Sequence, residues 1–495
     1  MEQKTSWFLQ LKNSKTVQTL NRFSRTPIFI GLLALGCILA YSLSLELVYY
    51  TLIVVCALFI LLFSEDFLVI IPMFLFCYIA PSPSNNPGRH ASSIFYLENG
   101  AWYMFILIAL VLPTVIARLA LDREIGRKKL LFTNRKLWLG MVILGGSYLL
   151  SGLGASHYKS IWTSNLLFAF LQFICIIGLY LLFTATVKWE KSHIDYFAWV
   201  MLIFGLTVSL EVFYHYVFRN LYSEEGVFIR ELIYTGWGNY NNVSAMIATA
   251  IPFAFYFACK YKRSYIYLGL SGVLIIGLIL SCSRASTLVG AMMFAVCFIV
   301  SIFLCQHKQE FCISAIAFSV LAVIFALVFK NDIGKIFSSI PDIVNTSTGV
   351  VNDSGRLGIY KEGFWAFLDN PIFGESFYRP EGANQWWQWS ENAEWKSFMP
   401  ARWHNTFIQM LASCGSVGLL AYLFHRFQTL KLFYQKLTLL NVFLGLSLAC
   451  FLGMSLLDCH LFNLGPTLIY SLMLCVAEKH PSDDTLPLFK KRKNQ

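Results

Sequence analysis

Charged residues are scarce in this sequence. Only 13% of its 495 residues are Asp, Glu, Lys or Arg, whereas 57% are hydrophobic, and the mean hydropathy is +0.61. A soluble domain needs more polar surface than this, since about a quarter of its residues are ordinarily charged. The shortage of charge therefore excludes a soluble globular protein and indicates a membrane protein.

Cysteine pairs and the motifs of metal and nucleotide sites are also missing. The 13 cysteines are scattered singly, mostly inside apolar runs, so neither a disulfide framework nor a zinc site is indicated. We expect them to pack as small apolar side chains. The sequence contains no D-x-D, H-E-x-x-H, Walker lysine or Rossmann glycine pattern. Nothing in it therefore supports a metal, a nucleotide or another cofactor.

Long apolar runs recur along the whole chain, and most are long enough to cross a bilayer as a helix. They predict an all-α, polytopic membrane helix bundle with about 12–14 transmembrane helices. The first run follows a basic tail and has no cleavage site, which argues against a signal peptide. We place spans at about 28–45, 47–63, 67–80, 101–119, 137–154, 164–186, 196–217, 243–259, 265–282, 286–304, 311–329, 404–425, 438–456 and 461–477.

The net charge of +11 reflects topology rather than nucleic-acid binding. With the N-terminus inside, 26 of the 38 lysines and arginines fall on inner segments and five on short outer loops, as the positive-inside rule requires. Both basic tails are then cytoplasmic, and anionic lipid headgroups are their natural partners. The predicted parts are a tail at 1–27, membrane helices at 28–329, a large extracytoplasmic loop at 330–403, membrane helices at 404–477 and a tail at 478–495.

Polar residues gather at the predicted outer ends of the spans. "SCSRAS" (281–286) places Arg284 between two apolar runs with almost no loop. An arginine within the bilayer costs about 2.5–3.5 kcal/mol, so one in this position usually serves a site. The alternative is an arginine that extends its side chain to the outer headgroups.

The large outer loop contains one segment that reads as a short amphipathic helix, "NDSGRLGIYKEGFWAFLDNPIFGES" (352–376). Asn370-Pro371 should end this helix, and Arg356 should lie in its first turn. Leu357, Tyr360, Phe364 and Leu368 would form one apolar stripe on the membrane surface. A guanidinium beside a helix N-terminus makes a good anion clamp, although Arg356 could also be an ordinary solvated arginine.

The run "ARWHNTFIQMLASCGSVGLL" (401–420) begins with Arg402, Trp403, His404 and Asn405 before it turns apolar. His404 is the group in this region that can exchange protons near neutral pH. A single histidine is more often a hydrogen-bonded structural residue, but two cations on the same side favour a catalytic one. Asn405 could orient a substrate or cap the next helix.

Two further polar groups lie towards the same side. Asn239 and Asn242 stand at the mouth of the 243–259 span, where they could bind sugar hydroxyls or a diphosphate, or cap the helix. Asp458 and His460 form a weaker signal at the next junction. Another three candidates recur every four residues on one face of the 196–217 span, as an internal ion-paired network or as support for the site: Glu211, His215 and Arg219.

This set of residues suits group transfer from a diphosphate. Two arginines and a helix N-terminus can hold a diphosphate and stabilise it as it leaves. A neutral histidine can take the proton from an attacking hydroxyl. Because nucleotide sugars are not expected outside the cell, the activated donor should arrive attached to a lipid.

The order of four motifs resembles the O-antigen ligase and O-antigen polymerase superfamily: "GNYNN…AIP", "SCSRAS", "SGRLGIYKEGFWAFLDNPIFG" and "RWHNTFIQMLASCGSVGLL", over roughly residues 236–425. One departure is that Gly374 is followed by Glu375 and Ser376, where the family often has G-x-G. The resemblance implies a bundle of about a dozen helices with one large outer loop in a bacterial cytoplasmic membrane.

The same resemblance implies glycosyltransferase chemistry of polysaccharide biosynthesis in the cell envelope. A glycan would pass from undecaprenyl diphosphate to an acceptor hydroxyl of a glycan, lipid or protein, without metal or nucleotide. By resemblance, Arg284 and Arg356 bind the diphosphate, and His404 is the base or orients the acceptor. Polymerase, ligase and protein O-glycosylation activities remain open, as does a flippase or exporter of lipid-linked oligosaccharide. A transporter should show internal pseudo-repeats, which the sequence lacks.

Overall fold

The computed structural model describes most of the predicted membrane region. Its described residues are 7–64, 67–83, 113–114, 136–155, 166, 168–187, 189, 194–221, 232–233, 235–328, 330, 356–377 and 402–480. Within them the chain is helical, and the one β-type pairing is an isolated bridge between Thr235 and Gly238. The predicted span at 101–119 lies almost entirely outside the described residues.

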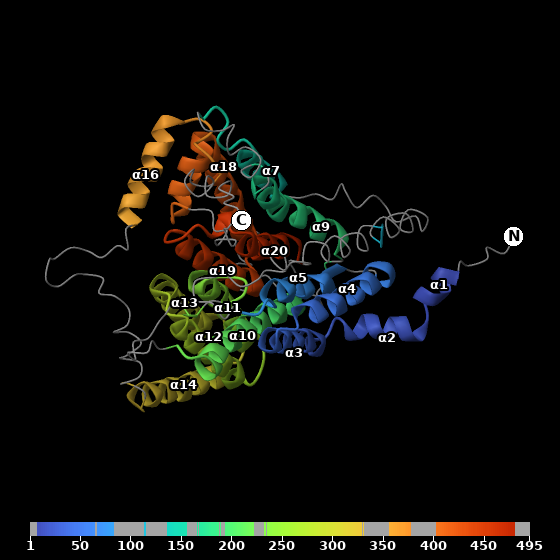
Figure 1. Ribbon diagram of the computed structural model, residues 1–495. Coiled ribbons are helices and arrows are strands. Elements are labelled where there is room, and N and C mark those ends of the chain that lie inside the picture. The colour runs from blue at the N-terminus through green and yellow to red at the C-terminus, as the bar shows by residue number, and fades with distance from the viewer. Residues whose placement is uncertain are drawn as a thin grey trace, which may run out of the picture.

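Helices account for the remaining predicted spans (Figure 1). The N-terminal part contains α1 (Trp7–Lys12), α2 (Lys15–Phe23), α3 (Pro27–Leu43), α4 (Glu46–Phe63) and α5 (Ile70–Ile79). The middle part contains α7 (Trp138–Leu149), α9 (Leu179–Thr186), α10 (Ile194–Phe218), α11 (Tyr240–Lys260), α12 (Ser264–Leu280), α13 (Arg284–Leu304) and α14 (Lys308–Val328). The last part contains α16 (Arg356–Asp369), α18 (Thr406–Gln435), α19 (Leu439–Ser455) and α20 (Leu464–Lys479), with the 3₁₀ turn η7 (His460–Phe462) before α20.

The length and hydropathy of these helices make the protein a multi-pass membrane protein. Six described helices can cross a membrane, or seven if the bent pair α2 and α3 counts as one span. Shorter apolar helices add further candidates at Phe67–Ile79, Trp138–Leu149, Ser264–Leu280 and Leu439–Ser455. The six long spans are Glu46–Phe63, Phe168–Ala185, Asp195–Phe218, Tyr240–Lys260, Arg284–Leu304 and Thr406–Gln435.

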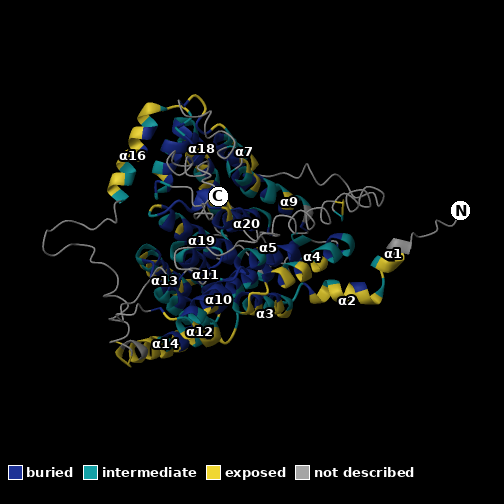
Figure 2. Ribbon diagram, in the orientation of Figure 1, coloured by how far each residue is buried: buried dark blue, intermediate teal, exposed yellow. Residues whose placement is uncertain are grey.

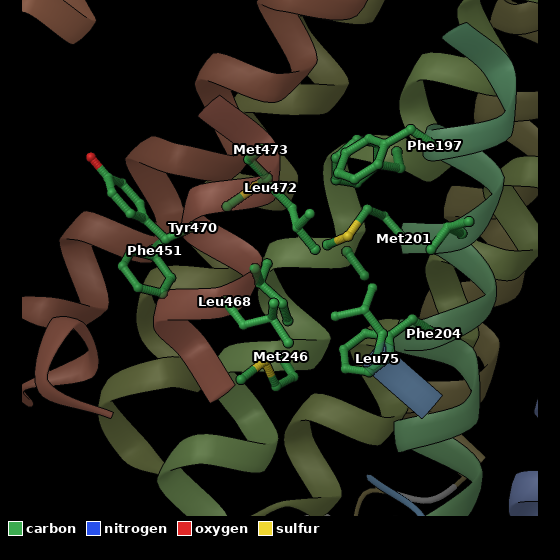
Figure 3. Packing of buried hydrophobic residues seen from close by; sticks show 14 of the residues in the cluster. Leu75, Phe197, Met201, Phe204, Met246, Phe451, Leu468, Tyr470, Leu472 and Met473 are labelled. Atoms are coloured by element: carbon green, nitrogen blue, oxygen red, sulfur yellow. The ribbon is translucent and has the colours of Figure 1, made fainter. Parts of the chain in front are cut away.

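Helix α11 forms the centre of the bundle. Every residue from 242 to 259 is buried, whereas α14 and the α16 face turned away from the bundle are largely exposed (Figure 2). Figure 3 shows Met201 and Phe204 of α10 facing Leu468 and Leu472 of α20, with Met246 of α11 beside them. Side chains of this size bury enough apolar surface to hold α10, α11 and α20 as one body.

The span predicted at 404–425 is observed as part of α18, which is broken at Gly415. This glycine has φ 63° and ψ −159°, a conformation that is essentially restricted to glycine. The rings of Phe407 and Tyr422 meet at 5.4 Å between centroids, although a straight helix would separate these residues by about 22 Å. The two halves, 406–414 and 416–435, therefore fold towards each other, and the second half alone is about 30 Å long, enough to cross the hydrocarbon core.

Candidate functional site

His404 stands at the start of α18, in contact with a buried carboxylate. Its Nδ1 lies 3.4 Å from Oδ1 of Asp458, and 40% of the His404 side chain is exposed against 10% of the Asp458 side chain. The carboxylate engages Nδ1, so Nε2 is the ring nitrogen that can exchange a proton with a substrate. The His404 backbone has φ 48°, a left-handed conformation that is uncommon for a residue with a Cβ.

Asp458 is held in its charged form by its surroundings. Burial alone would raise the pKa of Asp458, but the nearby His404 and His460 and the Cys459 amide lower it well below its usual range. The Cys459 N–H donates to Oδ1 at 2.7 Å. A permanent carboxylate beside His404 can orient the ring and stabilise an imidazolium. From the sequence alone, Asp458 is only a weaker signal.

Asp458 also links His404 to Ser283, at the start of the helix that carries Arg284. Asn241 donates from Nδ2 to Oδ2 of Asp458 at 3.4 Å, and the Ser283 hydroxyl donates to Oδ1 of Asn241 at 2.8 Å. Ser283 is the residue directly before Arg284, the first residue of α13. Three segments that are distant in sequence thus meet at one place, and Arg284 and His404 belong to the same region.

Arg356 approaches the same region on α16. The Tyr360 hydroxyl donates to the His404 carbonyl oxygen at 3.2 Å, and Gly363 is packed directly against Trp403. Arg356 precedes Tyr360 by four residues, so the two share one face of α16. Of the predicted apolar stripe, Leu357, Phe364 and Leu368 are exposed, whereas Tyr360 is turned towards His404.

Both arginines are the first residues of their helices, α13 and α16. The free N–H groups and the dipole at a helix N-terminus attract anions. A guanidinium beside each terminus adds a full positive charge and a planar set of donors that fits phosphate oxygens. Arg284 and Arg356 are both partly exposed, so that a ligand can reach them.

Three of the predicted amides cap or join helices. Oδ1 of Asn239 accepts from the Asn242 backbone N–H at 3.0 Å, and Oδ1 of Asn242 accepts from Nδ2 of Asn463 at 3.1 Å. Oδ1 of Asn405 accepts from the N–H groups of Phe407 and Ile408, while its Nδ2 donates to the Leu456 carbonyl. These contacts fix the ends of α11 and α18 beside the His404 region.

Arg402 precedes His404 by two residues in the sequence. Its positive charge acts on Tyr78, Cys459 and His460. Burial and the charge of Arg402 together lower the pKa of His460, against an opposing effect of Asp458. Arg402 and Asp458 therefore act on the pKa of His460 in opposite directions, and the pKa of His460 is lowered overall.

Glu211 and His215 on α10, and Arg219 directly after it, contact different elements. Oε2 of Glu211 accepts from the Trp237 indole at 2.8 Å, and Nε2 of His215 is 2.8 Å from the Tyr41 hydroxyl. Arg219 donates to the Pro83 carbonyl at 3.1 Å. Glu211 and His215 are fully buried, so they are out of reach of a substrate in this conformation.

Across the part of the chain that the structure describes, no cluster of three or more His, Cys, Asp or Glu side chains could hold a metal ion. All 13 cysteines are free thiols. Among the described residues, the partly exposed groups around His404 that could take part in chemistry include its own imidazole and the guanidinium groups of Arg284 and Arg356, with the Asp458 carboxylate against the imidazole.

A comparison of the sequence with models of known protein families finds a match that includes residues of this site. Residues 269–423 match the O-antigen ligase family model. The chain carries an O-antigen ligase domain. This match confirms the resemblance read from the four motifs, and it contains Arg284, Arg356 and His404. No curated protein matches the chain. This match supports a membrane protein of the glycan ligase or polymerase type in general, with lipid-linked glycan and an acceptor as its general class of partners.

Sequence reasoning missed or undervalued four residues of the O-antigen ligase domain and its surroundings. These are Asp458, Asn241, Ser283 and Tyr360. The signal available was polarity at the ends of apolar runs, as in "NYNN" and "LLDCH". It marked the right junctions but could not show which of them meet.

Proposed function

We propose that this protein transfers a glycan from undecaprenyl diphosphate to an acceptor hydroxyl at the outer face of the bacterial cytoplasmic membrane. The observation that supports the proposal is the linked set His404, Asp458, Asn241 and Ser283, which ties the imidazole to the start of the helix that carries Arg284. Tyr360 adds the helix of Arg356 to this set. A base and two anion-binding residues are the parts that such a transfer needs.

In the proposed reaction, Nε2 of His404 takes the proton of the acceptor hydroxyl as its oxygen attacks the anomeric carbon. The bond between that carbon and the diphosphate oxygen breaks, and the diphosphate leaves with the bonding electrons. Arg284 and Arg356 hold the negative charge that develops on the leaving group. Asp458 keeps the ring oriented and stabilises the imidazolium.

The acceptor decides between polymerase and ligase. We favour a polymerase of a surface polysaccharide, whose acceptor is itself a lipid-linked glycan. The site is taken to be extracytoplasmic, with both termini cytoplasmic, because the basic inner segments support that orientation. The reaction as proposed uses no metal and no nucleotide.

Purified protein in proteoliposomes, supplied with an undecaprenyl-diphosphate oligosaccharide, tests the proposal. Wild type should lengthen or transfer the glycan, and Arg284→Gln and Arg356→Gln should each lower kcat by about 10²–10³-fold, the usual cost of removing one group that stabilises a developing anion. Lys361→Gln, an exposed site on the same helix as Arg356, is the matched control and should keep full turnover.

Movement of labelled donor across the bilayer without any transfer would instead identify a flippase. Loss of activity in Lys361→Gln to the same extent as in Arg356→Gln would mean that α16 is sensitive as a whole. In that case Arg356 would have no particular role.

A further inference from the structure

The break in α18 leaves backbone groups that have to be paired inside the protein. A helix end exposes N–H and C=O groups that lack an intrahelical partner, and in a membrane each unpaired group costs several kcal/mol. At Gly415 one half-helix ends and another begins. This break therefore needs partners from elsewhere in the chain.

Residues 370–377, which follow α16 directly and are here called the wedge segment, supply these partners. The N–H of Ser416 donates to the Pro371 carbonyl at 2.8 Å, and the N–H of Val417 donates to the Ile372 carbonyl at 3.2 Å. In the other direction, the N–H of Glu375 donates to the Ala412 carbonyl at 2.7 Å. The wedge segment thus pairs with both halves of α18.

The far end of the wedge segment is fixed by side chains. The Phe377 carbonyl accepts from Nε2 of Gln409 at 3.1 Å and from the Ser413 hydroxyl at 3.0 Å, both from the first half of α18. The Phe377 ring packs against Tyr148 and Phe462, with centroids at 5.4 and 5.1 Å. A segment held by both backbone and side chains has little freedom to shift.

Two glycines allow the backbone of the wedge segment to approach the backbone of α18 closely. Gly374 has φ 71° and Gly415 has φ 63°, so both occupy backbone conformations that disfavour a Cβ. A Cβ on Gly374 would overlap the Ser413 backbone, and one on Gly415 would overlap the Ile372 carbonyl. At each glycine the opposite backbone occupies the space that a Cβ would fill.

The wedge segment joins the helix of Arg356 to the helix of His404. Within α16 itself, Tyr360 and Gly363 contact residues at the start of α18. Together, α16 and the wedge segment are therefore attached near both ends of the 406–414 half-helix. We propose that Gly374 and Gly415 are positioning residues, which seat the wedge segment in the break and thereby hold Arg356 at a fixed distance from His404. This inference rests on the proposed function for its catalytic consequence, but its structural part stands separately.

Hydrogen exchange measured by mass spectrometry tests the structural part without any substrate. Gly374→Ala should speed exchange in the wedge segment, α16 and residues 406–414, and leave α10 and α11 as protected as in wild type. Gly146→Ala is the matched control, since a Cβ there meets nothing within 4 Å, and it should leave all these segments unchanged. Unchanged protection of α16 and 406–414 in Gly374→Ala would overturn the proposal.

Ser413→Ala gives a milder second variant should Gly374→Ala not fold. It removes the hydroxyl that donates to the Phe377 carbonyl and should raise exchange in the same three segments to a smaller extent. If this folded variant exchanges at the same rate as wild type, the proposed role of the wedge segment is likewise contradicted.

A double-mutant cycle tests the catalytic part. Gly374→Ala should lower kcat by about 10²-fold, the scale of a 1 Å misplacement, with little change in KM for the acceptor. In an Arg356→Gln background the same change should cost less than about threefold, because the position of Arg356 no longer matters. Equal losses in both backgrounds would show that Gly374 does not act through Arg356. If wild type transfers nothing, the proposed function fails, while the exchange measurement still decides the wedge.

Discussion

His404 and His215 each have an acidic residue nearby, Asp458 and Glu211 respectively, but the two histidines differ in their exposure to solvent. His404 contacts Asp458 across two separate segments and keeps 40% of its side chain exposed. His215 follows Glu211 by one turn of α10, and both are buried, with Tyr41 and Trp237 as their respective partners. A histidine serves proton transfer only where a substrate can reach it, so burial and access, more than residue type, separate the two.

The sharpest test of this comparison replaces each imidazole in turn. His404→Ala should lower kcat by about 10²–10⁴-fold, the usual contribution of a positioned base. His215→Ala should keep kcat within a few-fold of wild type, but it leaves the buried Tyr41 hydroxyl unpaired and should cost about 1–3 kcal/mol of stability. Transfer assays and thermal unfolding in detergent measure both effects. Equal losses of kcat in the two variants would show that exposure to solvent does not separate the role of His404 from that of His215.

The carboxylates give a second, smaller contrast. Asp458→Asn should reduce kcat by roughly 10–10²-fold, since a hydrogen bond to a charged group contributes about 1.5–3 kcal/mol. Glu211→Gln keeps an oxygen that can accept from the Trp237 indole, so turnover should stay close to that of wild type. Steady-state kinetics on both variants decide the point, and a larger loss in Glu211→Gln would place catalysis on α10 instead.

The smallest expected effect concerns His460, which interacts electrostatically with Asp458. Burial lowers the pKa of His460 in the folded protein, so the unfolded chain binds more protons below the ordinary histidine pKa of about 6.5. The stability linked to this residue is present above that pH and is lost as the pH falls below it.

His460→Asn should therefore flatten the decline in stability between pH 6.5 and pH 5 by up to about 1.4 kcal/mol per pH unit. Thermal unfolding of both proteins across this range measures the slope. An unchanged slope would mean that folding does not lower the pKa of His460.

The positions of the helices follow well from the sequence because hydrophobicity alone defines them. The run predicted at 286–304 is observed as Arg284–Leu304, and the run at 243–259 as Tyr240–Lys260. Polar caps such as Asn239 mark the ends, since an apolar run has to stop where its first N–H groups find a partner.

The break in α18 could not be predicted in the same way. Gly415 lies in a continuous apolar run, where a glycine is compatible with an unbroken helix. The break is paired by the wedge segment at 370–377, which supplies carbonyl groups to Ser416 and Val417 from a part of the chain that is distant in sequence. Asp458 was undervalued for a similar reason, because its contact with His404 depends on how distant segments meet.

The backbone of His404 has a consequence for protein engineering. At φ 48° a residue with a Cβ is strained by about 1–2 kcal/mol relative to glycine, and the surrounding contacts have to absorb this cost. His404→Gly removes the imidazole and the strain together, and should unfold at a higher temperature than His404→Ala while remaining equally inactive. The chain thus retains a less stable residue at this position, as expected where selection acts on activity and stability is only sufficient.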